Sequence, residues 1–464
     1  MGLRPFCVAE AAAPAWVGPT GEGPGELNRN NDKEWPFMNE TELRNRQATA
    51  FLVGLELPSA YRDGWSAAES LDELERLVDT AGATVVGREV QSRPAPDVAT
   101  YIGRGKAEEI ELLRRELDFD FVIFDDELTP VQQRNLEKII ECQVLDRTAV
   151  ILDIFALRAR TREAKLQVEL AQLGYRLPRL TGKGVELSRQ AGSAGTVFNR
   201  GPGETKLEVD RRRIRDRMAA LRRELEEIKA HRERLRAERR ESAVPVVALT
   251  GYTNAGKSTL HRVLAGSDVL AEDRLFATLD ATTRRVQPAE GEPYLLVDTV
   301  GFIHNLPHHL VAAFRSTLEE VNQADLLLHV VDASHPKRAE QMATVHRVLE
   351  ELGAGDKPTL VVYNKIDRVD PAELDHLMRQ TPGAVAVAAA LGRNLDGLQA
   401  AIQQALHERR EVLEVVIPYA RSAWLSWVHE RGRVLTEEHR EDGTYVTVEL
   451  ERGLAARLRA ALDE

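Results

Sequence analysis

The segment GYTNAGKST, from Gly251 to Thr259, constrains this chain more than any other stretch of its sequence. It matches G-x-x-x-x-G-K-[ST], a glycine-rich loop that wraps around nucleotide phosphates. The apolar run before it, residues 244–250, predicts a buried strand, and the residues after it predict a helix. Backbone N–H groups of such a loop point at the phosphates. We therefore expect Lys257 to reach the β/γ-phosphate oxygens and Ser258 to place its hydroxyl on Mg²⁺.

A second motif, D-x-x-G, follows the apolar run YLLV and ends at Gly301. Asp298 stands where a carboxylate holds Mg²⁺, either directly or through water. Because Gly301 has no Cβ, its backbone N–H can approach the γ-phosphate. The two motifs in this order predict one centre for phosphate and magnesium.

A third motif, N-K-x-D, ends the apolar run of residues 360–367. The Asp367 carboxylate can accept two hydrogen bonds from guanine, one from N1–H and one from the exocyclic N–H₂. Adenine leaves that buried acceptor unpaired, at a cost of roughly 1–3 kcal/mol. We expect Lys365 to cover the base and Asn364 to brace the loop. After the first two motifs, this one predicts guanine preference and hence a GTPase.

A nucleotide-sensing loop belongs between the first two motifs, where the chain has FATLDATTRR, residues 276–285. This segment offers the hydroxyls of Thr278, Thr282 and Thr283 as a second Mg²⁺ ligand. The spacing alone does not choose between them.

The last base-contacting loop should follow the strand predicted at residues 384–388. The chain has AAALG there, beginning at Ala388, and not the usual Ser-Ala-Lys. We expect only backbone N–H contact to the guanine carbonyl from Ala388, Ala389 and Ala390.

Composition narrows the class of protein. A chain of 464 residues is long enough for three or four domains. Its two cysteines, Cys7 and Cys142, exclude a disulfide scaffold or a cysteine-based zinc site and fit a reducing cytosol. No apolar run reaches the ~18 residues of a membrane span. The N-terminus has no basic segment before an apolar one, so we expect no secretory signal.

The net charge of −12 conceals an asymmetry along the chain. Residues 158–241 hold 23 Lys/Arg and 13 Asp/Glu, a balance of +10, so the rest of the chain carries −22. A basic middle between acidic domains suggests a face that meets a polyanion. The alternative is a solvated helix with internal ion pairs.

The first part of the chain predicts two regions. Residues 1–45 are rich in Gly, Pro, Asn and Glu, which predicts a disordered extension. Residues 46–155 alternate, which predicts a small α/β domain with a mainly parallel sheet. The expected strands are 51–57, 83–87 and 121–124, and the expected helices are 70–78, 106–117 and 129–140, with Pro130 at the first position of the last helix. The sequence GRGK at residues 103–106 is either an anion site or a tight turn.

The basic middle, residues 156–242, predicts a helical hairpin. Residues 156–179 are expected to form a polar helix, and residues 181–204 a long glycine-rich loop. Beyond the loop, apolar residues recur every seven positions, as one long amphipathic helix would require: Leu207, Ile214, Leu221, Ile228 and Leu235. We expect the two helices to pack antiparallel with the loop at their tip. A structural spacer would explain the leucines but not a basic, glycine-rich tip.

The remaining chain completes the predicted fold class, an α/β multidomain protein. Residues 243–410 form the P-loop GTPase domain, and residues 411–464 form a small C-terminal α+β domain with a strand at 414–418, a helix at 422–429 and strands around 445–450. Trp424 and Trp427 are assigned to its core in preference to base stacking.

These features together resemble the HflX family, in the Obg-like branch of GTPases, over residues 48–464. The distinctive segments are YIGRGK (101–106), RGPGE followed by DRRRI (200–214), GYTNAGKS (251–258), FATLD (276–280) and GFIHNLPHHLVAAFRSTLE (301–319). The resemblance implies a cytoplasmic, Mg²⁺-dependent GTPase that binds the large (50S) ribosomal subunit and splits or rescues stalled or idle ribosomes, with a further role in ribosome biogenesis. A monomer is expected. The family pattern selects Thr278 as the magnesium threonine. The chain departs from it in the last guanine loop and in its N-terminal extension.

The resulting assignments are as follows. Lys257, Thr278 and Gly301 are catalytic, and Ser258, Thr278 and Asp298 hold Mg²⁺. Lys183, Arg189 and Arg200 in the glycine-rich loop contact RNA. GTP is bound by Gly251, Tyr252, Thr253, Asn254, Ala255, Gly256, Lys257, Ser258, Phe276, Ala277, Thr278, Leu279, Asp280, Asp298, Thr299, Val300, Gly301, Asn364, Lys365, Ile366, Asp367, Ala388, Ala389 and Ala390.

Two residues bear on the rate of hydrolysis. Many GTPases have a glutamine where this chain has Phe302, which cannot orient the attacking water. Either Phe302 packs in the core and another group places the water, or intrinsic hydrolysis is slow and the ribosome accelerates it. Asn254 resembles the asparagine of potassium-activated GTPases, where K⁺ neutralises charge that develops between the β- and γ-phosphates.

Three other function classes remain open on the sequence. One is a nucleotide-gated anti-association module in which hydrolysis only times release. Another is an NTP-driven enzyme that remodels free rRNA. The third, a membrane-associated GTPase, has no basic amphipathic helix with bulky aromatics and no lipidation signal to support it.

Overall fold

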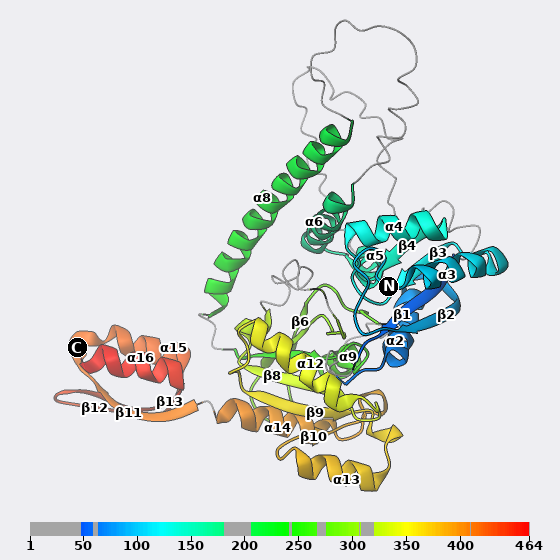
Figure 1. Cartoon of the computed structure of the whole chain (residues 1–464). Coiled ribbons are helices and arrows are strands. Elements are labelled where there is room, and N and C mark those ends of the chain that lie inside the picture. Colours follow the sequence, from blue (N-terminus) through cyan, green and yellow to red (C-terminus); the bar gives the residue numbers. More distant parts are fainter. Residues whose placement is uncertain are drawn as a thin grey trace, which may run out of the picture. The chain divides into compact units, whose positions relative to one another are not determined.

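Three β-sheets organise the described part of the chain (Figure 1). The computed structural model describes residues 48–58, 64–180, 206–240, 244–266, 275–305, 307, 320–408 and 410–463. The predicted disordered extension, residues 1–45, lies outside these ranges. So do Lys183, Arg189 and Arg200.

The first sheet has four parallel strands in the order β2-β1-β3-β4, which confirms the predicted α/β fold of this region. Local signals start its helices. The Ser66 and Glu69 side chains form a capping box at α2, and Thr129 and Gln132 form one at α4, which begins at Pro130 as predicted. The elements are β1 (Thr49–Glu56), α2 (Ala67–Ala81), β2 (Thr84–Ser92), α3 (Arg104–Leu117), β3 (Phe121–Phe124), α4 (Pro130–Ile140) and β4 (Gln143–Asp146).

The helix predicted at residues 156–179 is wrong at its start, because two helices occupy this region. They are α5 (Arg147–Arg158) and α6 (Arg162–Arg179). Thr161 ends the break between them and caps α6, since its Oγ1 accepts a hydrogen bond from Ala164 N–H at 3.1 Å. Most of α5 is buried, so apolar residues are not confined to one side of the helix. The sequence therefore lacks the amphipathic pattern that would mark α5 as a separate helix.

The predicted antiparallel hairpin is confirmed, with α6 packed on α8 (Lys206–Arg240). Two ion pairs show that the helices are antiparallel. Glu163, near the start of α6, pairs with Arg232, whereas Glu169, further along α6, pairs with the earlier Arg217 of α8. The apolar seam between the helices contains Leu166, Leu173, Met218 and Leu221. We call this pair of helices the hairpin.

The second sheet has six strands in the order β10-β9-β8-β5-β7-β6. All are parallel except β6, which runs antiparallel to β7. Its strands β5, β7 and β8 are near-continuous apolar runs, as expected for strands covered on both faces. The edge strand β6, TTRRV, is mostly exposed. The elements are β5 (Val246–Gly251), α9 (Lys257–Ala265), β6 (Thr282–Val286), β7 (Tyr294–Asp298), β8 (Leu326–Asp332), α12 (Arg338–Glu351), β9 (Thr359–Asn364), η2 (Ile366–Arg368), α13 (Pro371–Gln380), β10 (Val385–Ala386), η3 (Ala389–Leu391) and α14 (Leu395–His407).

The third sheet is antiparallel, in the order β11-β13-β12, and α15 and α16 contribute to its core. Trp424 and Trp427 pack against that core, which confirms the core assignment. The elements are β11 (Arg410–Ile417), η4 (Tyr419–Arg421), α15 (Ala423–Arg431), β12 (Arg433–Arg440), β13 (Gly443–Glu451) and α16 (Arg452–Asp463). Within the described ranges, none of the helices is both long and apolar enough to cross a membrane.

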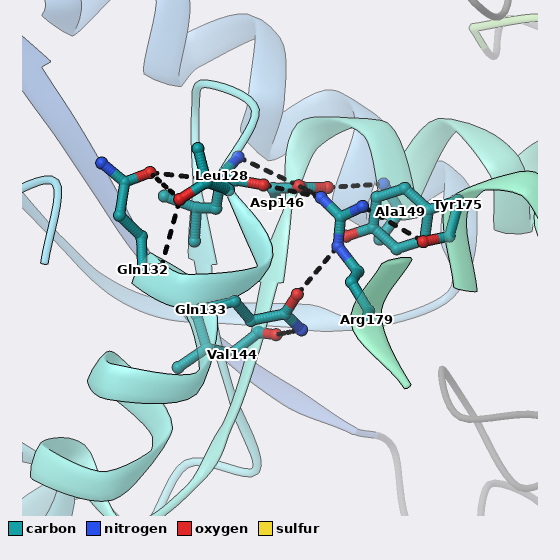
Figure 2. A network of polar contacts seen from close by, with 9 residues as sticks. Leu128, Gln132, Gln133, Val144, Asp146, Ala149, Tyr175 and Arg179 are labelled. Atoms are coloured by element: carbon teal, nitrogen blue, oxygen red, sulfur yellow. Dashed lines mark hydrogen bonds and ion pairs between the residues drawn. The ribbon is translucent and has the colours of Figure 1, made fainter. Parts of the chain in front are cut away.

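A buried polar network fixes the end of α6 to the first sheet, as Figure 2 shows. The Arg179 guanidinium lies 3.1 Å from Asp146 Oδ2 and also donates to Leu128 O at 2.7 Å and to Gln133 Oε1 at 2.9 Å. Asp146 in turn caps α5 by accepting from Ala149 N–H at 2.9 Å. The side chains of Arg179 and Asp146 are 13% and 1% exposed, so each charge depends on the other for its pairing.

We expect Arg179→Ala to lower the free energy of unfolding by about 3–5 kcal/mol, because it leaves the Asp146 carboxylate buried without its partner. Arg162→Ala on the same helix is the matched control. Its ion pair with Glu224 is exposed, so its loss should cost less than about 1 kcal/mol. Urea unfolding followed by circular dichroism measures both, and equal small losses would contradict the network.

Candidate nucleotide site

The phosphate-binding loop joins the central strand β5 to α9, at the carboxyl end of the parallel strands. Two of its glycines have positive φ, +144° at Gly251 and +96° at Gly256. A Cβ at Gly251 would lie 2.2 Å from Val330 O, and one at Gly256 would lie 2.2 Å from Asn364 Nδ2. Only glycine fits either position, so the motif's glycines are required by the packing around the loop.

Lys257 begins α9 and is buried under the loop. Its ammonium donates to Gly251 O at 3.0 Å and to Tyr252 O at 2.7 Å. Burial lowers the pKa of Lys257 to about 8, and the charge of Asp298 opposes that shift. Phosphate oxygens beside the ammonium would favour its charged form. A Cβ at Gly301 would lie 2.8 Å from Nζ, so the D-x-x-G glycine lies directly against this lysine.

Three oxygen-bearing side chains converge beside Lys257. Thr278 Oγ1 lies 2.8 Å from Ser258 Oγ and donates to Asp298 Oδ2 at 2.9 Å. Asp298 Oδ1 is buried and has no hydrogen-bond partner among the described residues. Two hydroxyls and a carboxylate suit Mg²⁺, and the orphaned oxygen is a free acceptor for the ion or its water. The residues therefore fit a magnesium ion.

The other two candidate threonines lie on β6, where Thr282 is the cross-strand neighbour of Asp298. Thr282 Oγ1 is 3.5 Å from Asp280 O, and Thr283 is exposed. Of the three hydroxyls that the spacing left open, the structure brings only Thr278 to Ser258 and Asp298.

The segment after Asp298 is hydrogen-bonded to the phosphate-binding loop. Phe302 N–H donates to Gly251 O at 3.1 Å, and Thr253 N–H donates to Phe302 O at 2.7 Å. The Phe302 side chain is 1% exposed and packs in the core. Thr299 and Val300 are also buried. The Phe302 side chain therefore cannot orient a water molecule.

Asn364 braces the predicted base-binding loops, as expected from the sequence. Its Nδ2 donates to Ala255 O at 2.9 Å, and its Oδ1 accepts from Ala389 N–H at 3.0 Å. Ala388 N–H donates to Arg393 O at 3.2 Å, so the N–H groups of Ala388 and Ala389 already have acceptors within the protein. Ala390 is the exposed member of the three alanines.

Of the other two residues of N-K-x-D, Lys365 is half-buried and Asp367 is exposed. Lys365 has a φ of +61°, and its Nζ lies 2.8 Å from Asp332 Oδ2. Asp367 is exposed at the start of η2, next to Ile366. Asn254, the potassium candidate, is exposed on the phosphate-binding loop with a φ of +59°.

A buried polar junction, which the sequence analysis missed, connects this site to the first sheet. The Tyr252 hydroxyl bonds to Glu73 and accepts from His304 N–H at 2.7 Å. The Arg147 guanidinium donates to Glu73 Oε2 at 2.8 Å and to His304 O at 2.9 Å, and it pairs with Asp125 at 3.0 Å. Burial raises the pKa of Glu73, and Arg147 opposes that shift. These residues are far apart in the chain, so no local spacing predicts the junction.

Of the predicted nucleotide contacts in FATLD, Phe276 and Leu279 are buried and Ala277 is partly buried. Asp280 directs its carboxylate to the start of α6, where it accepts from Arg160 N–H at 2.9 Å and from Thr161 N–H at 3.1 Å.

The fold and these loops define a P-loop GTPase. Four family models match successive parts of the chain: "GTP-binding GTPase N-terminal" over residues 68–156, "GTP-binding GTPase Middle Region" over 158–239, "50S ribosome-binding GTPase" over 246–365 and "HflX C-terminal domain" over 374–463.

Full-length relatives agree with these models. The chain is 48% identical over 411 residues to GTPase HflX of Lacrimispora saccharolytica, covering 87% of this chain and 94% of the relative. It is 46% identical over 340 residues to GTPase HflX of Escherichia coli, covering 73% and 79%. A GTP-binding protein of Sulfolobus solfataricus, solved in complex with GDP, is 26% identical with a TM-score of 0.40, covering 78% of this chain and 99% of that one. The chain belongs to the HflX family and is a GTPase.

We expect Tyr252→Phe to lower the free energy of unfolding by about 1–3 kcal/mol, because it leaves the Glu73 carboxyl and His304 N–H without a shared partner. Tyr294→Phe is the matched control, since the buried Tyr294 hydroxyl has no hydrogen-bond partner among the described residues and its removal should change little. Urea unfolding of both variants measures the difference. Equal effects would contradict the role given to the junction.

Proposed function

We propose that this GTPase binds the large ribosomal subunit while it holds GTP and splits or rescues stalled or idle ribosomes in the cytoplasm. The observation that carries the proposal is the match of residues 246–365 to the 50S ribosome-binding GTPase family, on a chain whose hairpin region is basic. Hydrolysis then removes the γ-phosphate and ends the bound state, because a ligand favours only the state that it binds more tightly.

The site residues divide the work of hydrolysis between them. Lys257 would hold the β- and γ-phosphate oxygens, and the Gly301 N–H would face the γ-phosphate. Ser258, Thr278 and Asp298 would hold Mg²⁺, which neutralises charge on the phosphates when bound. With Phe302 buried in the core, another group must orient the water, and we propose that the ribosome supplies or orders it.

The hairpin supplies the contact to RNA. Its glycine-rich loop holds Lys183, Arg189 and Arg200, and Arg212, Arg213 and Arg215 are exposed on α8 just beyond that loop. Lysine and arginine on RNA phosphates release counterions, so binding weakens as salt rises. If these residues only formed a solvated charged surface, binding to the subunit would not depend on them or weaken with salt through them.

Guanine selection is assigned to Asp367. We expect Asp367→Asn to weaken GDP binding about ten- to a hundredfold, because one acceptor that pairs with the base is replaced by a donor. Asp370→Asn, three residues on, is the control, since Asp370 is exposed and caps α13, where asparagine also caps well. Fluorescent-nucleotide titration measures both. Unchanged GDP affinity in the Asp367 variant would remove this assignment.

Sedimentation with purified 50S subunits tests the proposed function. We expect co-sedimentation with a non-hydrolysable GTP analogue and loss of it with GDP. A variant with Lys183, Arg189 and Arg200 changed to alanine should bind more weakly, with a salt slope shallower by about two to three, and should keep its nucleotide affinity. Equal co-sedimentation with GDP, with the analogue and without nucleotide would overturn the proposal. Unwinding of free rRNA without subunits would favour an RNA-remodelling enzyme.

A further inference from the structure

Residues 275–280, which include the first half of the nucleotide-sensing loop, touch two separate parts of the molecule. We call these residues the switch segment. Thr278, at its centre, faces Ser258 and Asp298, while Asp280 contacts Arg160 and the N-cap Thr161, just before α6. Thr278 and Asp280 are two residues apart in the chain, a span of at most about 7 Å. A displacement of Thr278 from its cluster would therefore also displace Asp280.

The Asp280 carboxylate receives three donors at the start of α6. Its Oδ2 accepts from Arg160 N–H at 2.9 Å and from Thr161 N–H at 3.1 Å, and its Oδ1 accepts from the Thr161 hydroxyl. Thr161 is also the residue that caps α6. Hydrogen bonds to a carboxylate are stronger than neutral ones, and the positive end of the helix adds to the attraction.

The other end of the switch segment is fixed as well. Phe276 packs edge-on against Phe155 of α5, with ring centroids 4.8 Å apart. Its φ of +52° is unusual for a bulky residue and persists only where the surroundings enforce it. Leu279, between Thr278 and Asp280, is 2% exposed. The segment is thus clamped to α5 and α6 on both sides of Thr278.

The base of the hairpin meets the GTPase domain at a second point. Arg232 of α8 pairs with Glu163, in the first turn of α6, and lies 3.9 Å from Glu320. The start of α6 therefore contacts Asp280, and its partner Arg232 on α8 contacts Glu320.

We propose that Asp280 is a positioning residue that ties the hairpin to the magnesium-facing threonine, and that its grip on Arg160 and Thr161 is made with GTP and released with GDP. The proposal rests on the proposed function of the nucleotide site. Asp280, assigned from sequence to the nucleotide, then acts through α6. In this proposal, the Asp280 carboxylate connects the hairpin to the switch segment.

Amide hydrogen exchange on the full chain tests this link. With Mg²⁺ and a saturating non-hydrolysable GTP analogue, we expect the Arg160 and Thr161 amides to exchange at least about tenfold more slowly than with Mg²⁺ and GDP. In Asp280→Ala, both amides should exchange fast in either state. Asp280→Asn keeps one acceptor oxygen and should be intermediate. Asp375→Ala, at an exposed aspartate of α13, should behave as wild type.

Amides in the middle of α6 report whether the helix itself survives each substitution. The proposal requires them to stay protected while only the Arg160 and Thr161 amides change. Equal protection of Arg160 and Thr161 with GDP and with the analogue would overturn it, as would protection that does not depend on Asp280. Fluorescent-nucleotide titration of the wild type separates the two proposals: nucleotide binding without a change in exchange overturns this inference alone, and absence of guanine-nucleotide binding overturns the proposed function.

Discussion

The convergence of Ser258, Thr278 and Asp298 is the contact on which the rest of the structure depends. Each side chain comes from a different element: Ser258 from α9, Thr278 from the switch segment and Asp298 from the end of β7. The hydrogen bonds of 2.8–2.9 Å that join these groups contribute only moderately to stability by themselves. A divalent cation among them would bind all three more strongly, so nucleotide state can control where the switch segment lies.

The segment matters because of what else it touches. Asp280 contacts the start of α6, and Phe276 packs against Phe155 of α5. Tyr252, in the phosphate-binding loop, bonds to Glu73 in the buried junction. In the proposed mechanism, a change at the phosphates reaches the first sheet and the hairpin through these contacts. This coupling requires only that the switch segment adopt two arrangements, and it needs no chain of contacts longer than these.

Sequence reasoning predicted much of this structure because the signals are local. The glycines at 251 and 256, the apolar strands of the second sheet and the proline at 130 each act within a few residues. It missed α5, whose apolar residues surround the whole helix, and it ran the α6 helix back into that region. It also missed Arg147 and Glu73, because a buried ion pair between residues 74 apart in the chain leaves no spacing to detect. The FATLD motif, taken alone, contains no information about α6, so it does not predict the contact of Asp280 with Arg160 and Thr161.

Thermodynamic linkage gives the most direct test of the central claim, that the γ-phosphate controls grip on the large subunit. If GTP favours the ribosome-bound state, the subunit must favour GTP by the same factor. We predict that saturating 50S subunits raise the affinity for a non-hydrolysable GTP analogue at least about fivefold and leave or lower the affinity for GDP. Equal changes in the affinities for the analogue and for GDP would contradict the account.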